Sequence, residues 1–395
     1  MSKPIRILYL APCRPTEKSY GTQLRTVQVA SALQTMGQLD FMVVKLAEDD
    51  READAGSKGE YSVRRVIKLQ PVASRSLLGR MRCGLDPRFI GFYGHTASAE
   101  DRAFVMSELP KYDLIWLHNI RTANTLNGWA WPKSVMDVDD IPSTFYRTVR
   151  EQATSAGARL SASVKLMVAR RRERFLPERF KVLTVCSEAD RQYLGLREKV
   201  HVIPNGFARP AGEPLRHLAT PPRIGFIGTF DYPPNVESVR WFINECWPLV
   251  KQQVPEARLR LIGKGSEAVA AGARDVDALG WVADPAAEIA SWAVMSVPVR
   301  TGAGTRVKIA EGFSRKCPIV STSLGAFGYD AQDGRQLFLA DSAADFAGAC
   351  IRVMREPENA AAMAERGWQE FLSKWTWDSI RPRVVAAAED GLRSA

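Results

Sequence analysis

Short runs of apolar residues alternate with longer amphipathic stretches along most of this chain. The first apolar run is Ile5–Pro12, an amphipathic stretch begins at Thr22, and a second apolar run follows at Leu39–Leu46. Continuous apolar runs of this length are typical of strands buried on both faces of a parallel sheet. Such strands are joined by right-handed crossovers that usually contain a helix. The alternation therefore predicts an α/β fold.

The alternation is interrupted once, at residues 206–222. This segment contains four prolines and shows neither helical nor strand periodicity, which is typical of an interdomain linker. We therefore predict an N-terminal Rossmann-like domain at 1–205, a second one at 223–376, and a C-terminal helix at 377–395 that crosses back to the first domain. Ligands of such sheets bind beyond the carboxyl ends of the strands, here in the cleft between the two domains.

The composition excludes several classes of protein. No apolar stretch is long enough to span a bilayer, and the N-terminus lacks the apolar run of a signal peptide. No C-x-x-C pair occurs, so reduced and mostly buried thiols are favoured over disulfides or a zinc site. We therefore expect a cytoplasmic protein. The cysteines are Cys13, Cys83, Cys186, Cys246, Cys317 and Cys350.

The formal net charge is +10, and a basic protein can bind nucleic acid, an anionic membrane or a phosphorylated small molecule. No nucleic-acid-binding motif is present, so we expect no nucleic-acid partner. The segment Lys165–Lys181 has seven basic and two acidic residues, and it also contains Leu166, Met167, Val168, Phe175 and Leu176. A basic segment with interleaved apolar residues predicts an anchor on the inner face of the cytoplasmic membrane; a solvated helix face is the alternative.

The segment Val297–Thr322 has the features of an anion site. Gly302 and Gly304 follow a predicted strand, and a helix begins near Thr305. The free amide groups at a helix N-terminus attract anions, and glycines let a ligand approach the backbone closely. Two cations beside this loop, Arg306 and Lys308, suit a diphosphate. An ordinary β-loop-α junction with surface charges remains the alternative.

The same segment, PVRTGAGTRVKIAEGFSRKCPIVST, resembles the donor-site motif of the retaining glycosyltransferases of family 4, in a subgroup with the pattern G-x-G-T-R-x-K-x-x-E. Three further passages resemble that family: YGTQLRTVQVASAL, VCSEADRQYL with VHVIPNGF, and FIGTFDYPPNVESVRWF. The resemblance implies a GT-B fold, with two Rossmann-like domains facing across a cleft. It also implies a hexosyltransferase that needs no metal, with the acceptor bound in the first domain and a UDP-sugar or GDP-sugar in the second.

The resemblance also implies roles for individual residues. Glu311 matches the second glutamate of the E-x7-E motif, which hydrogen-bonds the nucleotide ribose, and His118 falls where the family places a histidine near the transferred sugar. Arg306 and Lys308 are expected to neutralise the diphosphate and assist catalysis. The remaining expected donor contacts are Gly21, Arg25, Gly228, Thr229, Val282, Gly302, Gly304 and Thr305.

One departure from the family pattern leaves alternatives open. Ala303 stands where the first glutamate of E-x7-E belongs. A catalytically silent partner in glycan assembly is therefore one alternative. A sugar-nucleotide epimerase of the same fold is a further alternative. The pair Asp137 and Asp139 has the D-x-D spacing of a metal site in another glycosyltransferase fold, but it lies in the first domain, so a structural role is favoured. The favoured function is sugar transfer to a glycan or polyprenyl-diphosphate-linked acceptor in bacterial polysaccharide or glycoconjugate biosynthesis.

Overall fold

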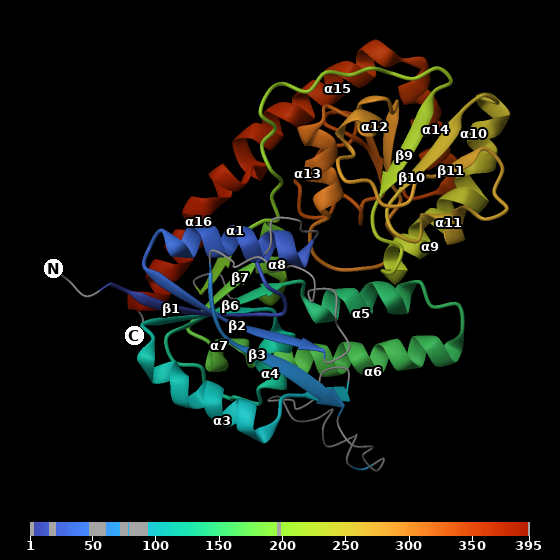
Figure 1. Cartoon of the computed structure of the whole chain (residues 1–395). Coiled ribbons are helices and arrows are strands. Elements are labelled where there is room, and N and C mark those ends of the chain that lie inside the picture. Colours follow the sequence, from blue (N-terminus) through green and yellow to red (C-terminus); the bar gives the residue numbers. More distant parts are fainter. Residues whose placement is uncertain are drawn as a thin grey trace. The chain divides into compact units, whose positions relative to one another are not determined.

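The computed structural model describes residues 4–15, 21–46, 61–71, 78, 94–195 and 199–393. Its residues form two compact units, each built on its own sheet (Figure 1). The N-terminal unit comprises Met1–Arg147, Ser155–Pro204 and Ile380–Ala395, and the C-terminal unit comprises Thr148–Thr154 and Asn205–Ser379. Within the described ranges, no helix is both long and apolar enough to cross a membrane.

The N-terminal unit is built on an eight-stranded sheet with the order β4-β3-β2-β1-β5-β6-β7-β8. All neighbouring strands run parallel except β3 and β4, which are antiparallel. The apolar runs predicted as strands lie in this sheet, because a strand buried on both faces needs side chains of that kind at every position. The strands are β1 (Arg6–Ala11), β2 (Gln38–Leu46), β3 (Ser62–Pro71), β4 (His95–Thr96), β5 (Leu114–His118), β6 (Ser134–Asp139), β7 (Val182–Val185) and β8 (Val200–Val202).

The helices of this unit are α1 (Thr22–Gln34), α3 (Ala99–Glu108), the 3-10 helix η2 (Leu109–Lys111), α4 (Ile120–Thr125), α5 (Pro142–Glu151), α6 (Ala156–Glu173), α7 (Leu176–Arg179) and α8 (Glu188–Leu194). The sequence predicts a long helical stretch over roughly residues 143–179, and in the structure this stretch is helical but divided into α5, α6 and α7. Ser155 restarts the helix as an N-cap that accepts the N–H of Ala158, and Pro177 lies in the first turn of α7.

The C-terminal unit is built on a six-stranded parallel sheet with the order β11-β10-β9-β12-β13-β14. Its strands are β9 (Arg223–Ile227), β10 (Arg258–Ile262), β11 (Val276–Ala278), β12 (Val294–Val297), β13 (Ile319–Ser321) and β14 (Phe338–Leu339). Its helices are α9 (Pro233–Trp241), the π-helix η3 (Phe242–Cys246), α10 (Trp247–Gln253), α11 (Ser266–Ala270), α12 (Ala286–Ala290), α13 (Val307–Ser314), α14 (Ala343–Arg355), α15 (Pro357–Glu370) and the π-helix η4 (Phe371–Trp375).

Helix α16 (Trp377–Arg393) ends the chain, and its residues from Ile380 onward group with the N-terminal unit. Gly391 allows this packing, because a Cβ atom there would lie 2.7 Å from Leu114 and 2.9 Å from Val135. Asp390 lies 2.9 Å from His201 of β8. A small residue and a hydrogen bond therefore fix this helix on the first sheet.

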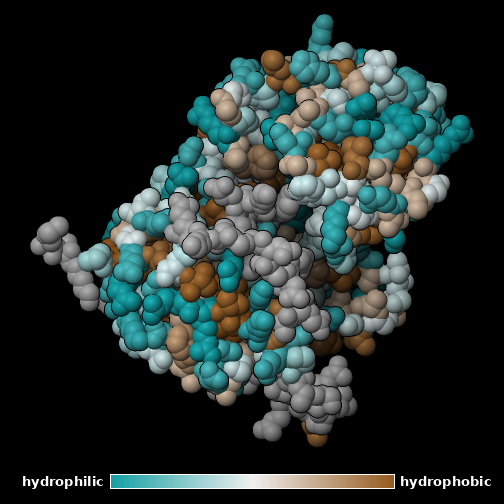
Figure 2. Space-filling view, viewed as in Figure 1, coloured by the Kyte–Doolittle hydropathy of each residue, from teal (hydrophilic) through white to brown (hydrophobic). Residues whose placement is uncertain are grey.

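Each sheet has its own hydrophobic core of side chains that are fully or almost fully buried. On the face shown in Figure 2, the remaining hydrophobic residues form small separate areas among hydrophilic ones. Four of the five described cysteines are buried, and Cys83 lies outside the described residues. Burial raises the pKa of the Cys246 thiol to about 12, so this residue is a packing group rather than a nucleophile.

Candidate active site

The loop between β12 and α13 has the backbone that its glycines make possible. Gly302 has a φ of 128° and Gly304 a φ of 69°, a region that disfavours any residue with a Cβ. Arg306 is the N-cap residue of α13, and its guanidinium folds back to donate to the carbonyls of Ala303 and Gly304. Thr305 is only 7% exposed, and its hydroxyl has no hydrogen-bond partner among the described residues. The loop thus brings a cation and a buried hydroxyl to the N-terminus of α13.

Lys308 joins this loop to the one after β9. Its ammonium donates to Oδ1 of Asn235 at 2.9 Å and lies 4.9 Å from the ring centroid of Phe226. The Asn235 amide donates in turn to the carbonyl of Thr229 at 2.7 Å. Gly228 leaves room for both side chains, because a Cβ there would lie 3.0 Å from the ammonium of Lys308. Burial lowers the pKa of Lys308 to about 8, Arg306 adds to that effect, and Glu311 opposes it.

Glu311 lies one turn further along α13 and is 9% exposed. Burial raises its pKa to about 7; Arg315 and Lys308 oppose this, and Asp284 adds to it. No hydrogen bond joins its carboxylate to another described side chain. A buried carboxyl without such a partner is unfavourable in a purely structural role, so Glu311 has the character of a group that receives a ligand.

Three strand-end loops meet at the same edge of this sheet. Gly263, after β10, has a φ of 135°, and a Cβ there would lie 1.9 Å from the carbonyl oxygen of Gly228. Its N–H donates to the carbonyl of Gly280, after β11, at 2.7 Å. Val282 follows Gly280 and packs half-buried against the hydrophobic core. The residues predicted to bind the donor in this unit therefore lie on neighbouring loops, and sequence reasoning missed Gly263.

Arg25, which the sequence predicts as a donor contact, lies in the core of the N-terminal unit. Its side chain is 1% exposed and donates from Nε and Nη2 to both carboxylate oxygens of Asp137, at 2.9 and 2.6 Å. Its Nη1 donates to the carbonyl of Ile203 at 2.9 Å. Arg25 therefore ties α1 to β6 and to the segment after β8. The guanidinium is therefore committed to hydrogen bonds in the core of the N-terminal unit.

His118 ends β5, as predicted, but its side chain is fully buried. Its Nδ1 lies 3.0 Å from the hydroxyl of Thr26 and its Nε2 lies 3.5 Å from Asp139. Asp139 has a φ of 56° at a register shift between β6 and β7, and it accepts a hydrogen bond from the thiol of Cys186 at 3.0 Å. Burial would raise the pKa of Asp139, but His118 and Arg25 outweigh it and hold that pKa well below its usual range.

These contacts also account for the D-x-D spacing. Asp137 is paired with Arg25 and accepts the hydroxyl of Thr184 at 2.7 Å, while Asp139 faces His118 and Cys186. Both carboxylates serve as structural partners, and no cluster of three or more metal-ligating side chains occurs in the described part of the chain. Gly21, the N-cap residue of α1, is exposed with a φ of 52°, and an added Cβ would meet open space.

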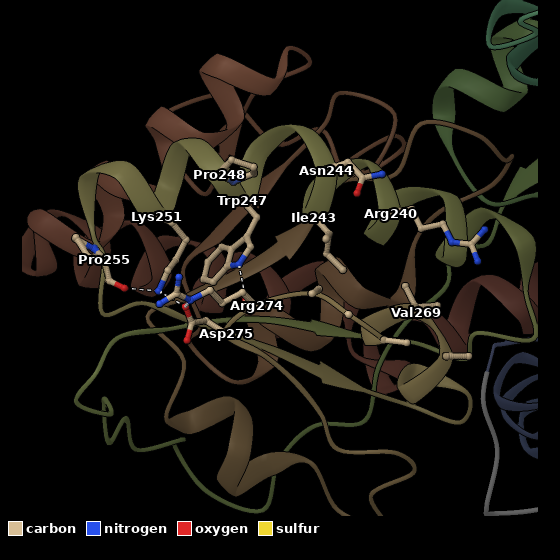
Figure 3. A pocket seen from close by; sticks show the side chains of 14 residues that line it. Arg240, Ile243, Asn244, Trp247, Pro248, Lys251, Pro255, Val269, Arg274 and Asp275 are labelled. Carbon is tan, nitrogen blue, oxygen red and sulfur yellow. Dashed lines mark hydrogen bonds and ion pairs between the residues drawn. The ribbon is translucent and has the colours of Figure 1, made fainter.

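A surface hollow of about 810 Å³ lies elsewhere on the C-terminal unit, beside α9, α10 and α11 (Figure 3). Trp247 forms part of its wall and donates from its indole to the carbonyl of Arg274 at 3.1 Å. Lys251 is held by Asp275 at 2.9 Å. None of the residues predicted to bind the donor lines this hollow, so it is separate from the candidate site.

Comparisons with known proteins place the site in a family context. Residues 221–356 match the family model described as glycosyl transferases group 1. A protein of Klebsiella pneumoniae, described as an uncharacterized 44.6 kDa protein in the cps region, is 24% identical over 157 residues. That match covers 37% of this chain and 40% of the relative, so less than two thirds of the relative's length is matched.

Solved structures show the same fold. Anabaena Alr3699/HepE in complex with UDP-glucose superposes with a TM-score of 0.65 at 15% identity, covering 97% of this chain and 98% of that one. WaaG, a glycosyltransferase involved in lipopolysaccharide biosynthesis, superposes with a TM-score of 0.61 at 14% identity and the same coverage. The protein has the GT-B fold with two Rossmann-like domains, which confirms the predicted fold class.

Replacing Glu311 with glutamine is expected to stabilise the protein in a pH-dependent way. The raised pKa means that the folded protein loses stability as pH rises from about 4.5 to about 7, because the unfolded chain releases a proton that Glu311 retains. The free energy of unfolding of Glu311→Gln should therefore exceed that of the wild type by about 2–3 kcal/mol near pH 8 and by much less near pH 5. Urea denaturation at the two pH values measures this difference. The exposed Glu256→Gln is the control, and an equal effect of Glu311→Gln at both pH values would contradict the assignment.

Proposed function

We propose that the protein is a retaining glycosyltransferase that moves a hexose from a nucleotide-diphosphate sugar to a glycan or glycolipid acceptor. The observation that carries this proposal is the meeting of Arg306, Lys308 and Glu311 at one edge of the C-terminal sheet. Two cations and a buried carboxyl without a hydrogen-bonding side chain are the groups that a nucleoside diphosphate needs. The match of this same unit to the family model of glycosyl transferases group 1 supports the assignment.

In this proposal each group has a separate task. Lys308 and Arg306, with the amide groups at the N-terminus of α13 and the hydroxyl of Thr305, hold the diphosphate. Glu311 accepts hydrogen bonds from the ribose hydroxyls, and Val282 contacts the base. Gly228, Thr229, Gly302 and Gly304 let the backbone approach the ligand closely. Gly21 lets the backbone of the N-terminal unit approach the ligand in the same way. His118, at the end of β5, is the residue proposed to lie near the transferred sugar.

The proposed chemistry is substitution on one face of the sugar. The bond between the anomeric carbon and the diphosphate oxygen breaks, and the acceptor oxygen bonds to that carbon on the same face. The acceptor proton passes to an oxygen of the departing diphosphate. Preorganised cations stabilise the negative charge that develops on this leaving group. In this proposal Lys308 and Arg306 supply the compensating positive charge, and the reaction needs no metal.

The comparisons and the charge support a choice of donor and acceptor. A similar structure holds UDP-glucose, so UDP-sugars are the first choice of donor and GDP-sugars the second. Another neighbour is named for lipopolysaccharide biosynthesis. We therefore propose a glycan or polyprenyl-diphosphate-linked acceptor, used in bacterial polysaccharide or glycoconjugate assembly by an enzyme of the cytoplasm and the inner membrane face.

A second candidate function rests on Ala303. Its methyl group cannot hydrogen-bond a sugar hydroxyl as the family glutamate does, which favours a catalytically silent glycan-assembly partner that binds a nucleotide but transfers nothing. An epimerase would need a pair of acid and base carboxylates around the sugar, and among the residues assigned to the donor above only Glu311 carries a carboxylate.

A ligand screen tests the proposal. UDP, GDP and their hexose derivatives are each added to the purified protein, and the thermal unfolding of the protein is measured. A true ligand at 100 times its dissociation constant should stabilise the fold by about 2.7 kcal/mol. Release of nucleotide from the stabilising sugar, with and without a glycan acceptor, then separates transferase from silent partner. Stabilisation by none of these compounds would overturn the proposed function.

A further inference from the structure

Helix α6 has two apolar faces on opposite sides. The inner face is buried and consists of Ala162, Leu166, Ala169 and Glu173, spaced by four, three and four residues. The outer face carries three large apolar side chains that are 68%, 49% and 60% exposed, namely Leu160, Val164 and Met167. They are spaced by four and three residues, and at 3.6 residues per turn this stripe lies opposite the buried one.

The inner face accounts for the packing of α6 on its own unit, where it lies beside α5 (Figure 1). The buried carboxylate of Glu173 accepts the N–H of Ser143 at 2.8 Å and its hydroxyl at 2.5 Å. The ammonium of Lys165, on α6, lies 5.9 Å from the ring centroid of Tyr146, on α5. Leu160, Val164 and Met167 take no part in this packing. Exposed apolar residues in a row, unlike single ones, mark an interaction surface.

The charge on α6 is of one sign. The helix carries five basic residues, Arg159, Lys165, Arg170, Arg171 and Arg172, and its single acidic residue, Glu173, is buried. Arg171 continues the outer stripe four residues after Met167, and the exposed Arg174 follows the helix. The accessible charges on α6 itself are therefore all positive.

The structure corrects which residues of the basic segment are available. Leu166 and Leu176, predicted from sequence as part of an anchor, are buried. Arg179 is also buried, and it donates to Asn124 at 2.8 Å and to the carbonyl of Gly128 at 3.1 Å. The accessible apolar residues of the helix begin further upstream, at Leu160.

We propose that the outer face of α6 is a docking surface for an anionic lipid bilayer, with Leu160, Val164 and Met167 entering the headgroup region. An apolar stripe flanked by cations is the pattern of a helix that lies in the membrane interface. With 18 residues, α6 is about 27 Å long, enough to rest along the surface. A protein partner would be expected to meet a mixture of charges, whereas one sign alone complements acidic headgroups. The inference deepens the proposed function, on which it rests for the lipid-linked acceptor.

Vesicle flotation tests this surface. The wild type should float with vesicles of phosphatidylglycerol and phosphatidylcholine at physiological ionic strength, and not with phosphatidylcholine alone. Leu160→Gln, Val164→Gln and Met167→Gln combined should reduce binding about tenfold or more. Arg170→Gln, Arg171→Gln and Arg174→Gln combined should do the same and reduce the salt dependence. The matched control is Leu215→Gln with Leu218→Gln, two exposed leucines outside α6.

Three flotation results would contradict the proposed docking surface. Equal binding to neutral and anionic vesicles, no binding at low salt, or full binding by the Leu160, Val164 and Met167 variant would overturn the proposal. Unchanged thermal unfolding of the variants shows that they remain folded. Nucleotide stabilisation is measured on the same proteins without vesicles, so a protein that floats but binds no nucleotide contradicts the proposed function and leaves the docking surface standing. A protein that binds nucleotide but does not float contradicts the docking surface and leaves the proposed function standing.

Discussion

Arg25→Ala is expected to destabilise the protein by about 3–5 kcal/mol, because it leaves a buried carboxylate without its cation. Asp137 is fully buried and both of its oxygens accept hydrogen bonds from Arg25. After the substitution the hydroxyl of Thr184 still donates to Oδ1 of Asp137, but the two hydrogen bonds from the guanidinium are lost. The carbonyl of Ile203 also loses a donor. Urea denaturation followed by far-ultraviolet circular dichroism measures the loss.

The pairing with Asp137 provides the control. Arg25→Met combined with Asp137→Leu removes both charges together and should recover a large part of the stability, since apolar replacements of a buried ion pair are often neutral. A matched surface variant is Arg64→Ala, whose side chain is 45% exposed. If Arg25→Ala unfolds like the wild type but binds nucleotides poorly, Arg25 contacts the donor after all and its structural role is wrong.

The role of Arg25 shows what sequence alone could not supply. The periodicity of α1 and the apolar runs of β1 and β6 predicted the elements, because each depends on neighbours in the chain. The pairing of Arg25 with Asp137 joins residues 112 positions apart, and no local pattern encodes it. A glycine loop followed by an arginine therefore looked like an anion site, although the arginine turns inward.

In the C-terminal unit the sequence was more informative. The two glycines and two cations around the start of α13 lie within one short segment, so their spacing predicted their proximity. The contact of Lys308 with Asn235, 73 positions away, and the contact of Gly263 with Gly228 required the order of the parallel strands. Residues 233–253 form α9, η3 and α10 and not one α-helix, because a π-helical segment at 242–246 interrupts the α-helical pattern.

The same reasoning applies to the basic segment at 165–181. Counting charges and apolar residues located it, but only the direction of each side chain separates the buried Leu166 from the exposed Met167. Adjacent residues of a helix point about 100° apart. The apolar residues of this segment are therefore divided between a buried face and an exposed face. The sequence predicted the helix, and the packing on α5 decided which face is outside.

Lys308→Met is expected to weaken nucleotide-diphosphate binding by about 10- to 100-fold while stabilising the unliganded protein. The loss reflects one charge-assisted contact, worth about 1.5–3 kcal/mol. The gain has a different cause: burial lowers the pKa of Lys308 to about 8, so the cation is disfavoured in the folded state at neutral pH. That penalty is complete below about pH 8 and disappears as pH rises through about 10.5, where the unfolded chain also loses the proton.

Isothermal titration with UDP and urea denaturation, each at about pH 7 and pH 10, separate these two effects. Lys264→Met is the control, because its side chain is 71% exposed and pairs with Asp231 on the same unit. Arg306→Ala should also weaken binding about tenfold or more, and the double variant should lose at least as much as the stronger single one, since neighbouring cations do not act additively. Normal affinity in both single variants would show that the diphosphate binds elsewhere. Weaker binding together with lower stability would instead make Lys308 a structural lysine, because only a group held in place for a ligand costs stability when that ligand is absent.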